Sequence, residues 1–229
     1  MITLEEIQAR IAAIIDQDSE APDYSSEDWL LRRRYINMAQ DEWAQLYNWP
    51  SLFREYNTMT STSTSNVTVS LPTDFRVISG YPKVPTNGTN DEFPQVLPQQ
   101  KSQKDKTDKY FYQVGDRRLG YSLVFNPGTA SGQFASGASV YISYYATATS
   151  LVSPSDMTSC PDPEYLVKRA TAYLLESRED PRYPNAKVEA EKILQRLLKR
   201  ETTQTEAQND YSRIRTVEET RYGFRIGRN

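Results

Sequence analysis

Histidine is absent from the 229 residues of this chain, and cysteine occurs once, at Cys160. A single thiol excludes an intrachain disulfide and a cysteine-based metal knuckle. Serine, threonine and cysteine nucleophiles usually take a histidine as base, and zinc and non-haem iron sites usually need imidazole ligands. The commonest hydrolase and metalloenzyme designs are therefore excluded, and we expect no cofactor, no metal site and no catalytic residues.

The sequence also lacks a strong charge of either sign, a long apolar run and a glycine-rich phosphate loop. Thirty acidic against 27 basic residues give a formal net charge of -3, whereas a protein that neutralises nucleic acid shows a basic excess. Because apolar runs are short, we expect no membrane span and no signal peptide. No nucleotide fingerprint or nucleophile elbow is present. Together these absences favour a structural or assembly protein, made in a cytoplasm, over an enzyme.

Helical periodicity dominates both ends of the sequence. A first helix is predicted to begin at Thr3, where Glu6 completes a capping box. A second is predicted to begin at Ser25, with Asp28 as its capping partner. Trp49-Pro50 ends it, because proline lacks an amide donor and disfavours helical geometry in the residue before it.

Residues 1–52 thus hold one predicted pair of helices, and residues 151–203 hold a second. In the second pair, Asp162 is placed as an N-cap and Pro163 fits the first helical position. The second helix of the chain carries a broad aromatic face, which can bury about 150–250 Å² per large side chain. We expect the other helices to pack against this face, which includes Trp29, Tyr35, Trp43 and Tyr47.

Residues 53–150 change character and predict a strand-rich insertion between the helical pairs. Several runs alternate apolar and polar residues or concentrate tyrosine, valine and phenylalanine, as strands do. We interpret the last three as an antiparallel meander, and Gly80–Gln100 as irregular surface because of its prolines and glycines. The runs are Asn66–Leu71, Arg76–Ser79, Tyr110–Val114, Leu119–Phe125 and Ser139–Ala146.

Residues 204–229 lack helical periodicity and hold too few apolar residues to order themselves. The last nine, RYGFRIGRN, alternate arginine with aromatic and aliphatic side chains, which suits an extended segment that adds a strand to a partner or places anchors in its grooves. A frayed terminus is the alternative. The candidate partner-binding residues are Arg213, Arg215, Arg221, Tyr222, Phe224, Arg225, Ile226 and Arg228. The predicted fold is therefore α+β: a four-helix bundle-like core, an antiparallel strand-rich insertion and an extended C-terminal arm.

Two basic groups are candidate contacts to a neighbouring subunit or to DNA. Consecutive arginines on a helix point around most of a turn, so the three in the second helix cannot share one face. Surface salt bridges for the arginines, and simple solvation for the lysines, are the alternatives. The candidates are Arg32, Arg33, Arg34, Lys101, Lys104 and Lys106.

The loop at residues 16–26 is rich in acids, with Asp16, Asp18, Glu20 and Asp23 close together. Ala21 stands where an EF-hand needs glycine, and no glutamate occupies the twelfth position. We therefore interpret this loop as a solvated link between two helices rather than a calcium site.

Three segments together carry a family resemblance: WLLRRRYINMAQDEWAQLYNWPSL, NVTVSLPTDFRVISG and VYISYYATATSLVSPSDMTSCPDPEYLVKRATAYLL. They resemble the head-to-tail connector, or adaptor, proteins of tailed bacteriophages, including the tail tubular protein A type. The resemblance implies a virion structural protein at the head-tail junction, assembled as a ring of twelve copies below the portal. DNA would pass through the ring without sequence recognition. The arm would contact the portal protein, and the insertion would face the next tail or nozzle protein.

Two other classes stay open. A different tail or baseplate subunit could use the same helices and sheets. A glycosidase acting on cell-wall sugar needs only two carboxylates, for which Asp91 and Asp116 in the insertion are the candidates.

Overall fold

The computed structural model describes residues 2–59, 67–86, 89–105, 107–126 and 139–223, and for residues 59, 85–86, 89–91 and 204–223 it describes the backbone alone. The chain divides into two compact units. A helical unit combines Met1–Tyr47 with Ser150–Asn229, and a strand unit comprises Asn48–Thr149. The mixed α+β class predicted from the sequence is confirmed.

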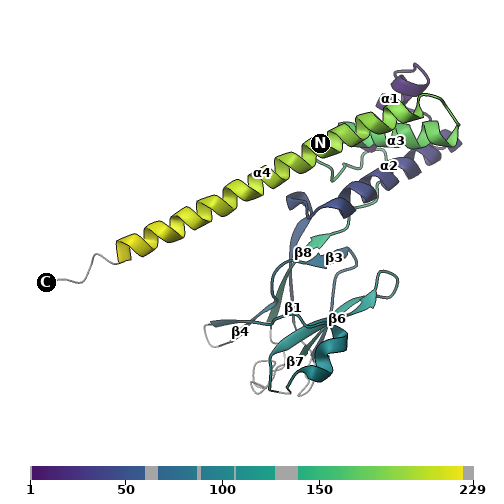
Figure 1. Ribbon diagram of the computed structural model, residues 1–229. Coiled ribbons are helices and arrows are strands. Elements are labelled where there is room, and N and C mark those ends of the chain that lie inside the picture. The colour runs from purple at the N-terminus through teal and green to yellow at the C-terminus, as the bar shows by residue number, and fades with distance from the viewer. Residues whose placement is uncertain (1, 60–66, 87–88, 106, 127–138, 224–229) are drawn as a thin grey trace. The chain divides into compact units, whose positions relative to one another are not determined.

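The helical unit is built from α1 (Leu4–Ile15), α2 (Glu27–Leu46), α3 (Pro163–Ser177) and α4 (Tyr183–Gly223) (Figure 1). The helix α3 contacts each of the other three, so the prediction that α2 is the centre of packing is wrong. The small, fully buried Ala170 and Ala172 allow close approach of neighbouring helices to α3. A four-helix bundle core is not confirmed. The strands separate α2 from α3 in the sequence, and the main contact of α4 is with α3 alone.

Local chemistry sets the starts of the helices. The Thr3 hydroxyl accepts from the Glu6 amide and the Glu6 carboxylate accepts from the Thr3 amide, which confirms the capping box. Asp162 caps α3, with Pro163 at the first position as predicted. The cap of α2 is Ser26, one residue later than predicted, because the Ser25 amide and hydroxyl donate instead to the Asp23 carboxylate.

The helix α4 runs 41 residues to Gly223. The prediction of an extended arm from residue 204 is therefore wrong for the backbone as far as this glycine. Between residues 185 and 222 the sequence contains neither proline nor glycine, and its glutamate, glutamine, arginine and alanine favour helix, so nothing local stops the helix. Sequence periodicity missed this because it measures an apolar face, and residues 204–223 contain few apolar residues.

The strand unit contains two antiparallel sheets rather than one meander. In the first, β8 (Ser139–Ala146) pairs along one side with β1 (Phe53–Met59). Its other side pairs with β3 (Phe75–Ile78) and with β4 (Lys83–Thr86), which forms a hairpin with β5 (Thr89–Glu92). The second sheet has the order β2 (Val67–Ser70), β7 (Gly120–Asn126), β6 (Tyr110–Asp116).

The strand unit differs from the sequence predictions in three ways. The last predicted run, β8, belongs to a different sheet from β6 and β7. The strand β1 was not predicted from the sequence, and it pairs with β8 along its whole length. Gly80–Gln100 is not irregular throughout, because it contains the β4–β5 hairpin and the start of the 3₁₀ helix η2 (Pro98–Gln103).

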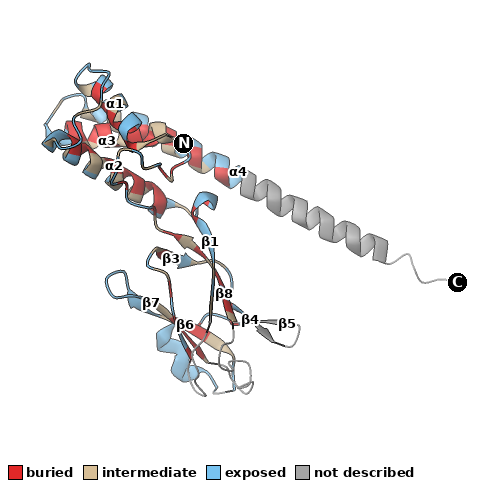
Figure 2. Ribbon diagram, turned by 180° about the vertical axis from the view of Figure 1, so that it is seen from behind, coloured by how far each residue is buried: buried red, intermediate tan, exposed pale blue. Residues whose placement is uncertain are grey.

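The core of the strand unit lies between its two sheets. Val69 of β2 and Phe125 of β7 belong to the same buried cluster as Ile142 and Tyr144 of β8. In the helical unit, the buried positions gather where α1, α2 and α3 face one another (red in Figure 2). Each unit therefore has a core of its own.

Candidate functional site

The three consecutive arginines of α2 have three different environments. Arg32 is only 2% exposed and donates to Asp16 at 2.5 Å and Asp28 at 3.4 Å. Its Nε and Nη1 atoms have no partner among the described residues. Arg33 donates to the Val152 carbonyl at 3.3 Å, and Arg34 is exposed. Arg32 is thus an internal ion-pair residue, which corrects its place among the candidate contact residues.

The lysine candidates lie in and after η2 of the strand unit. The Lys101 ammonium sits 5.4 Å from the centroid of the Tyr112 ring, in cation–π geometry. Lys104 is exposed. Lys106 lies outside the described residues.

The candidates in the predicted arm fall into two groups. Arg213, Arg215, Arg221 and Tyr222 belong to the helical backbone of α4. Phe224, Arg225, Ile226 and Arg228 lie outside the described residues. As a result, the backbone at these four positions is helical and not the extended chain that the sequence predicted.

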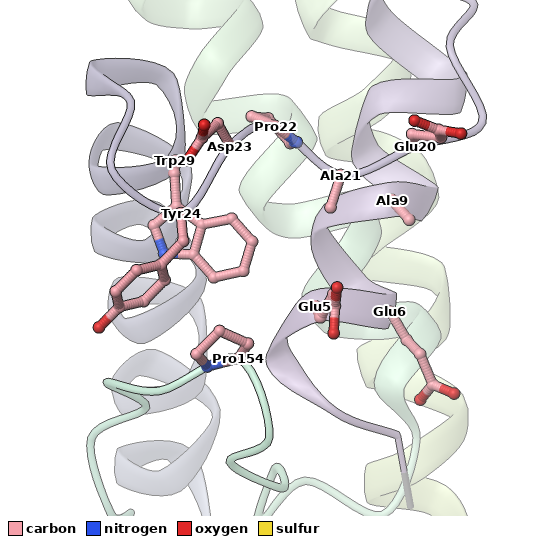
Figure 3. A pocket seen from close by; sticks show the side chains of 10 residues that line it. All are labelled: Glu5, Glu6, Ala9, Glu20, Ala21, Pro22, Asp23, Tyr24, Trp29 and Pro154. Carbon is pink, nitrogen blue, oxygen red and sulfur yellow. The ribbon is translucent and has the colours of Figure 1, made fainter.

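A pocket of about 490 Å³ opens between α1 and the loop that leads into α2 (Figure 3). Figure 3 shows Tyr24, Trp29 and Pro154 on one side of it and the carboxylates of Glu5 and Glu6 on the other. The rings of Tyr24 and Trp29 meet edge to face with centroids 5.4 Å apart. The indole N–H of buried Trp29 has no acceptor among the described residues. We call this feature the acidic pocket; its lining is Glu5, Glu6, Ala9, Glu20, Ala21, Pro22, Asp23, Tyr24, Trp29 and Pro154.

The acidic pocket carries four carboxylates and no basic side chain in its lining. The Glu6 carboxylate accepts a hydrogen bond from the Thr3 amide at 2.8 Å. Hydrogen bonds from the Ser25 amide and hydroxyl lower the pKa of Asp23 and keep it ionised. Among the described residues, Glu5 and Glu20 make no ion pair. The site is therefore negative around an aromatic wall, which suits a cationic side chain with an apolar stem.

Sequence reasoning assigned the acids of residues 16–26 to a solvated link and did not predict a pocket. The missing partners are Glu5, Trp29 and Pro154, which come from three distant places in the sequence. No local pattern could have joined them, because only the packing of α1 beside the loop brings them together.

The described residues do not support the catalytic alternatives. Asp116 accepts hydrogen bonds from the Arg118 and Leu119 amides, both at 2.8 Å, and so stabilises the turn between β6 and β7. The side chain of Asp91 lies outside the described residues. Burial raises the pKa of the Cys160 thiol to about 12, which suppresses the reactive thiolate. Within the described part of the chain, no three histidine, cysteine, aspartate or glutamate side chains group as metal ligands.

Of the helices in the described residues, none combines the length and the apolar composition that crossing a bilayer requires.

Comparison with known families covers nearly the whole chain. The family model described as SU10 adaptor protein matches residues 2–217. A search of curated proteins found no match. The family match spans both units, including α1, the strand insertion and most of α4. The chain therefore belongs to the SU10 adaptor protein family and is a structural head-tail adaptor of a bacteriophage.

Proposed function

We propose that this adaptor is a head-to-tail connector subunit of the tail tubular protein A type, twelve copies of which form a ring below the portal. The ring attaches the tail and lets DNA pass through its lumen without sequence recognition. Structural adaptors of this kind are typically not enzymes, which agrees with a chain that lacks histidine. The near-neutral net charge of -3 supports the channel, because a strongly basic lumen would hold the DNA phosphates.

The observation that carries the proposal is the length of α4. This helix has 41 residues, whereas α3, on which it packs, has 15. At about 1.5 Å per residue, α4 is about 40 Å longer than α3. Isolated helices are marginal in water, and most helical stability in proteins comes from packing. We therefore assign the C-terminal half of α4 and the residues after it to the portal, which gives this segment a packing partner.

The strand unit supplies the second contact of the proposed connector, to a tail or nozzle protein. Several large apolar side chains of this unit are exposed, including Leu119 at 83%, Leu97 at 57% and Tyr81 at 53%. Exposed Lys104 and the stacked Lys101 lie in the same unit. Exposed apolar and aromatic side chains of this kind are typical of protein interfaces.

Deletion of residues 208–229 tests the portal contact. The cut lies beyond the last described buried side chain, Glu201, so the melting temperature and the circular dichroism per remaining residue should stay near the full-length values. Capture of the chain by purified portal rings should be lost. The double variant Arg117→Ala, Arg118→Ala, in the exposed β6–β7 turn, is the control and should still be captured.

Two results would overturn the proposal. Undiminished portal capture after the deletion would show that the C-terminal segment does not bind the portal. A trimer or hexamer that ignores the portal in electron micrographs would instead identify a tail or baseplate subunit.

A further inference from the structure

Between residues 188 and 199, the outward face of α4 carries three basic side chains that form no ion pair with the described residues. Ala190, Ile193 and Leu197 are buried on the side of α4 that packs on α3. Lys192, Arg196 and Lys199 are exposed and line a shallow groove of about 430 Å³ together with Val188, Glu191 and Gln195. These positions follow the helical repeat and so form one stripe. We call this stripe the basic face.

The basic face differs from the other charged positions near it. Lys168 reaches Glu189 at 2.9 Å, and Arg200 reaches Glu201 at 3.3 Å. Lys192, Arg196 and Lys199 have no carboxylate within ion-pair distance among the described residues. Val188, 47% exposed, adds an apolar side chain to the same stripe.

The acidic pocket has the complementary properties. It offers unpaired Glu5 and Glu20 around the aromatic wall of Tyr24 and Trp29. The pocket is lined by α1, the loop after it, the start of α2 and Pro154, whereas the main contact of α4 is with α3. Because α3 lies against the opposite side of α4, the basic face points out of the helical unit. One copy therefore cannot place its own basic face in its own acidic pocket.

We infer that the basic face of one copy docks in the acidic pocket of the next copy, which makes the head-to-tail contact of the proposed ring. The inference rests on the proposed function, which it deepens by naming the surfaces between subunits. A lysine or arginine of the basic face lays its stem along the aromatic wall and its charge near Glu5 and Glu20. Each copy uses both surfaces, as a heterologous contact that closes a ring requires. DNA could bind the basic face through its phosphates, but it would leave the acidic pocket without a partner.

Charge reversal with complementation tests this contact. One variant carries Lys192→Glu and Arg196→Glu, and the other carries Glu5→Lys and Glu20→Lys. The first variant alone presents two acidic surfaces, and in the second the two new lysines offset Glu6 and Asp23, so its pocket loses its net negative charge. Each variant alone should self-associate at least about 100-fold more weakly than the wild type at low salt. An equimolar mixture should assemble again, because the new lysines of one variant then meet the new glutamates of the other, and the unchanged basic face meets the unchanged acidic pocket. Analytical ultracentrifugation, with and without purified portal rings, measures both effects.

The matched control is Arg117→Glu with Arg118→Glu, which changes the charge by the same amount in the strand unit and should assemble like the wild type. Circular dichroism checks that all variants are folded. If single variants assemble normally, or if both fail and the mixture also fails, the inferred contact is wrong while the ring proposal stands. If the wild type stays monomeric with and without portal, the ring proposal is wrong and the inferred contact is wrong with it.

Discussion

The guanidinium of Arg169 on α3 donates two hydrogen bonds, both of 2.7 Å, to the carboxylate of Glu42 on α2. The Tyr173 hydroxyl donates to the same carboxylate at 2.6 Å, and the Arg169 guanidinium lies 4.8 Å from the centroid of the Tyr173 ring. Arg169 is 127 residues from Glu42 in the sequence. This bidentate ion pair therefore joins the helical segments on either side of the strand insertion.

Removal of the Glu42 carboxylate should destabilise the helical unit. Glu42→Ala leaves the partly buried Arg169, whose side chain is 15% exposed, without its ionic partner. We expect a loss of about 2 kcal/mol in the free energy of unfolding, measured by urea denaturation. Arg10→Ala breaks the more exposed Arg10–Glu164 pair and should cost no more than about 0.5 kcal/mol. Equal effects of the two variants would show that the Glu42 carboxylate contributes little.

Substitution of Arg32 and of Arg34 should change the free energy of unfolding by very different amounts. Arg32→Ala leaves a cavity at a buried position and should cost about 3 kcal/mol in unfolding free energy. Arg32→Met keeps most of the volume and removes the unpartnered Nε and Nη1 donors, so it should cost less than about 1 kcal/mol. Exposed Arg34→Ala should change the free energy by less than about 0.5 kcal/mol. Denaturation curves in which Met is as harmful as Ala at position 32 would show that the charge itself is needed.

Ionisation of Tyr144 should lower the stability of the fold at alkaline pH. Its hydroxyl donates to Asp74 at 3.0 Å, and burial, followed by the Asp74 hydrogen bond and charge, raises its pKa from 10.0 to about 12. A group whose pKa is higher in the folded than in the unfolded state stabilises the fold while it is protonated. The contribution of Tyr144 is therefore complete below pH 10 and is lost as the pH rises through 12. Tyr144→Phe should cost about 1 kcal/mol near neutral pH, and its deficit against the wild type should shrink as the pH approaches 12.

Melting temperatures of the wild type and Tyr144→Phe across this pH range check that prediction. The exposed Tyr141→Phe on the same strand is the control and should melt like the wild type near neutral pH. A constant difference between the wild type and Tyr144→Phe from pH 8 to pH 12 would contradict the assigned role of the Tyr144 hydroxyl.

The sequence by itself determined the features that depend on residues three or four positions apart. The Thr3–Glu6 capping box and the Asp162–Pro163 start of α3 appear as predicted. The ranges of β6, β7 and β8 were predicted to within about two residues at each end. Alternation and a high content of β-branched or aromatic residues can be recognised within a single strand. Membership of a phage adaptor family also followed from the sequence, because patterns of residue types along three segments carry it.

Tertiary structure alone decided which elements meet. The sequence holds no local signal that β8 pairs with β1 rather than β7, or that α3 contacts every other helix. It could not separate buried Arg32 from exposed Arg34, nor bring Glu5, Glu20 and Trp29 to one pocket. The physical reason is the same in each case: burial and pairing depend on groups distant in sequence, whose free energy of contact is realised only once the chain has packed.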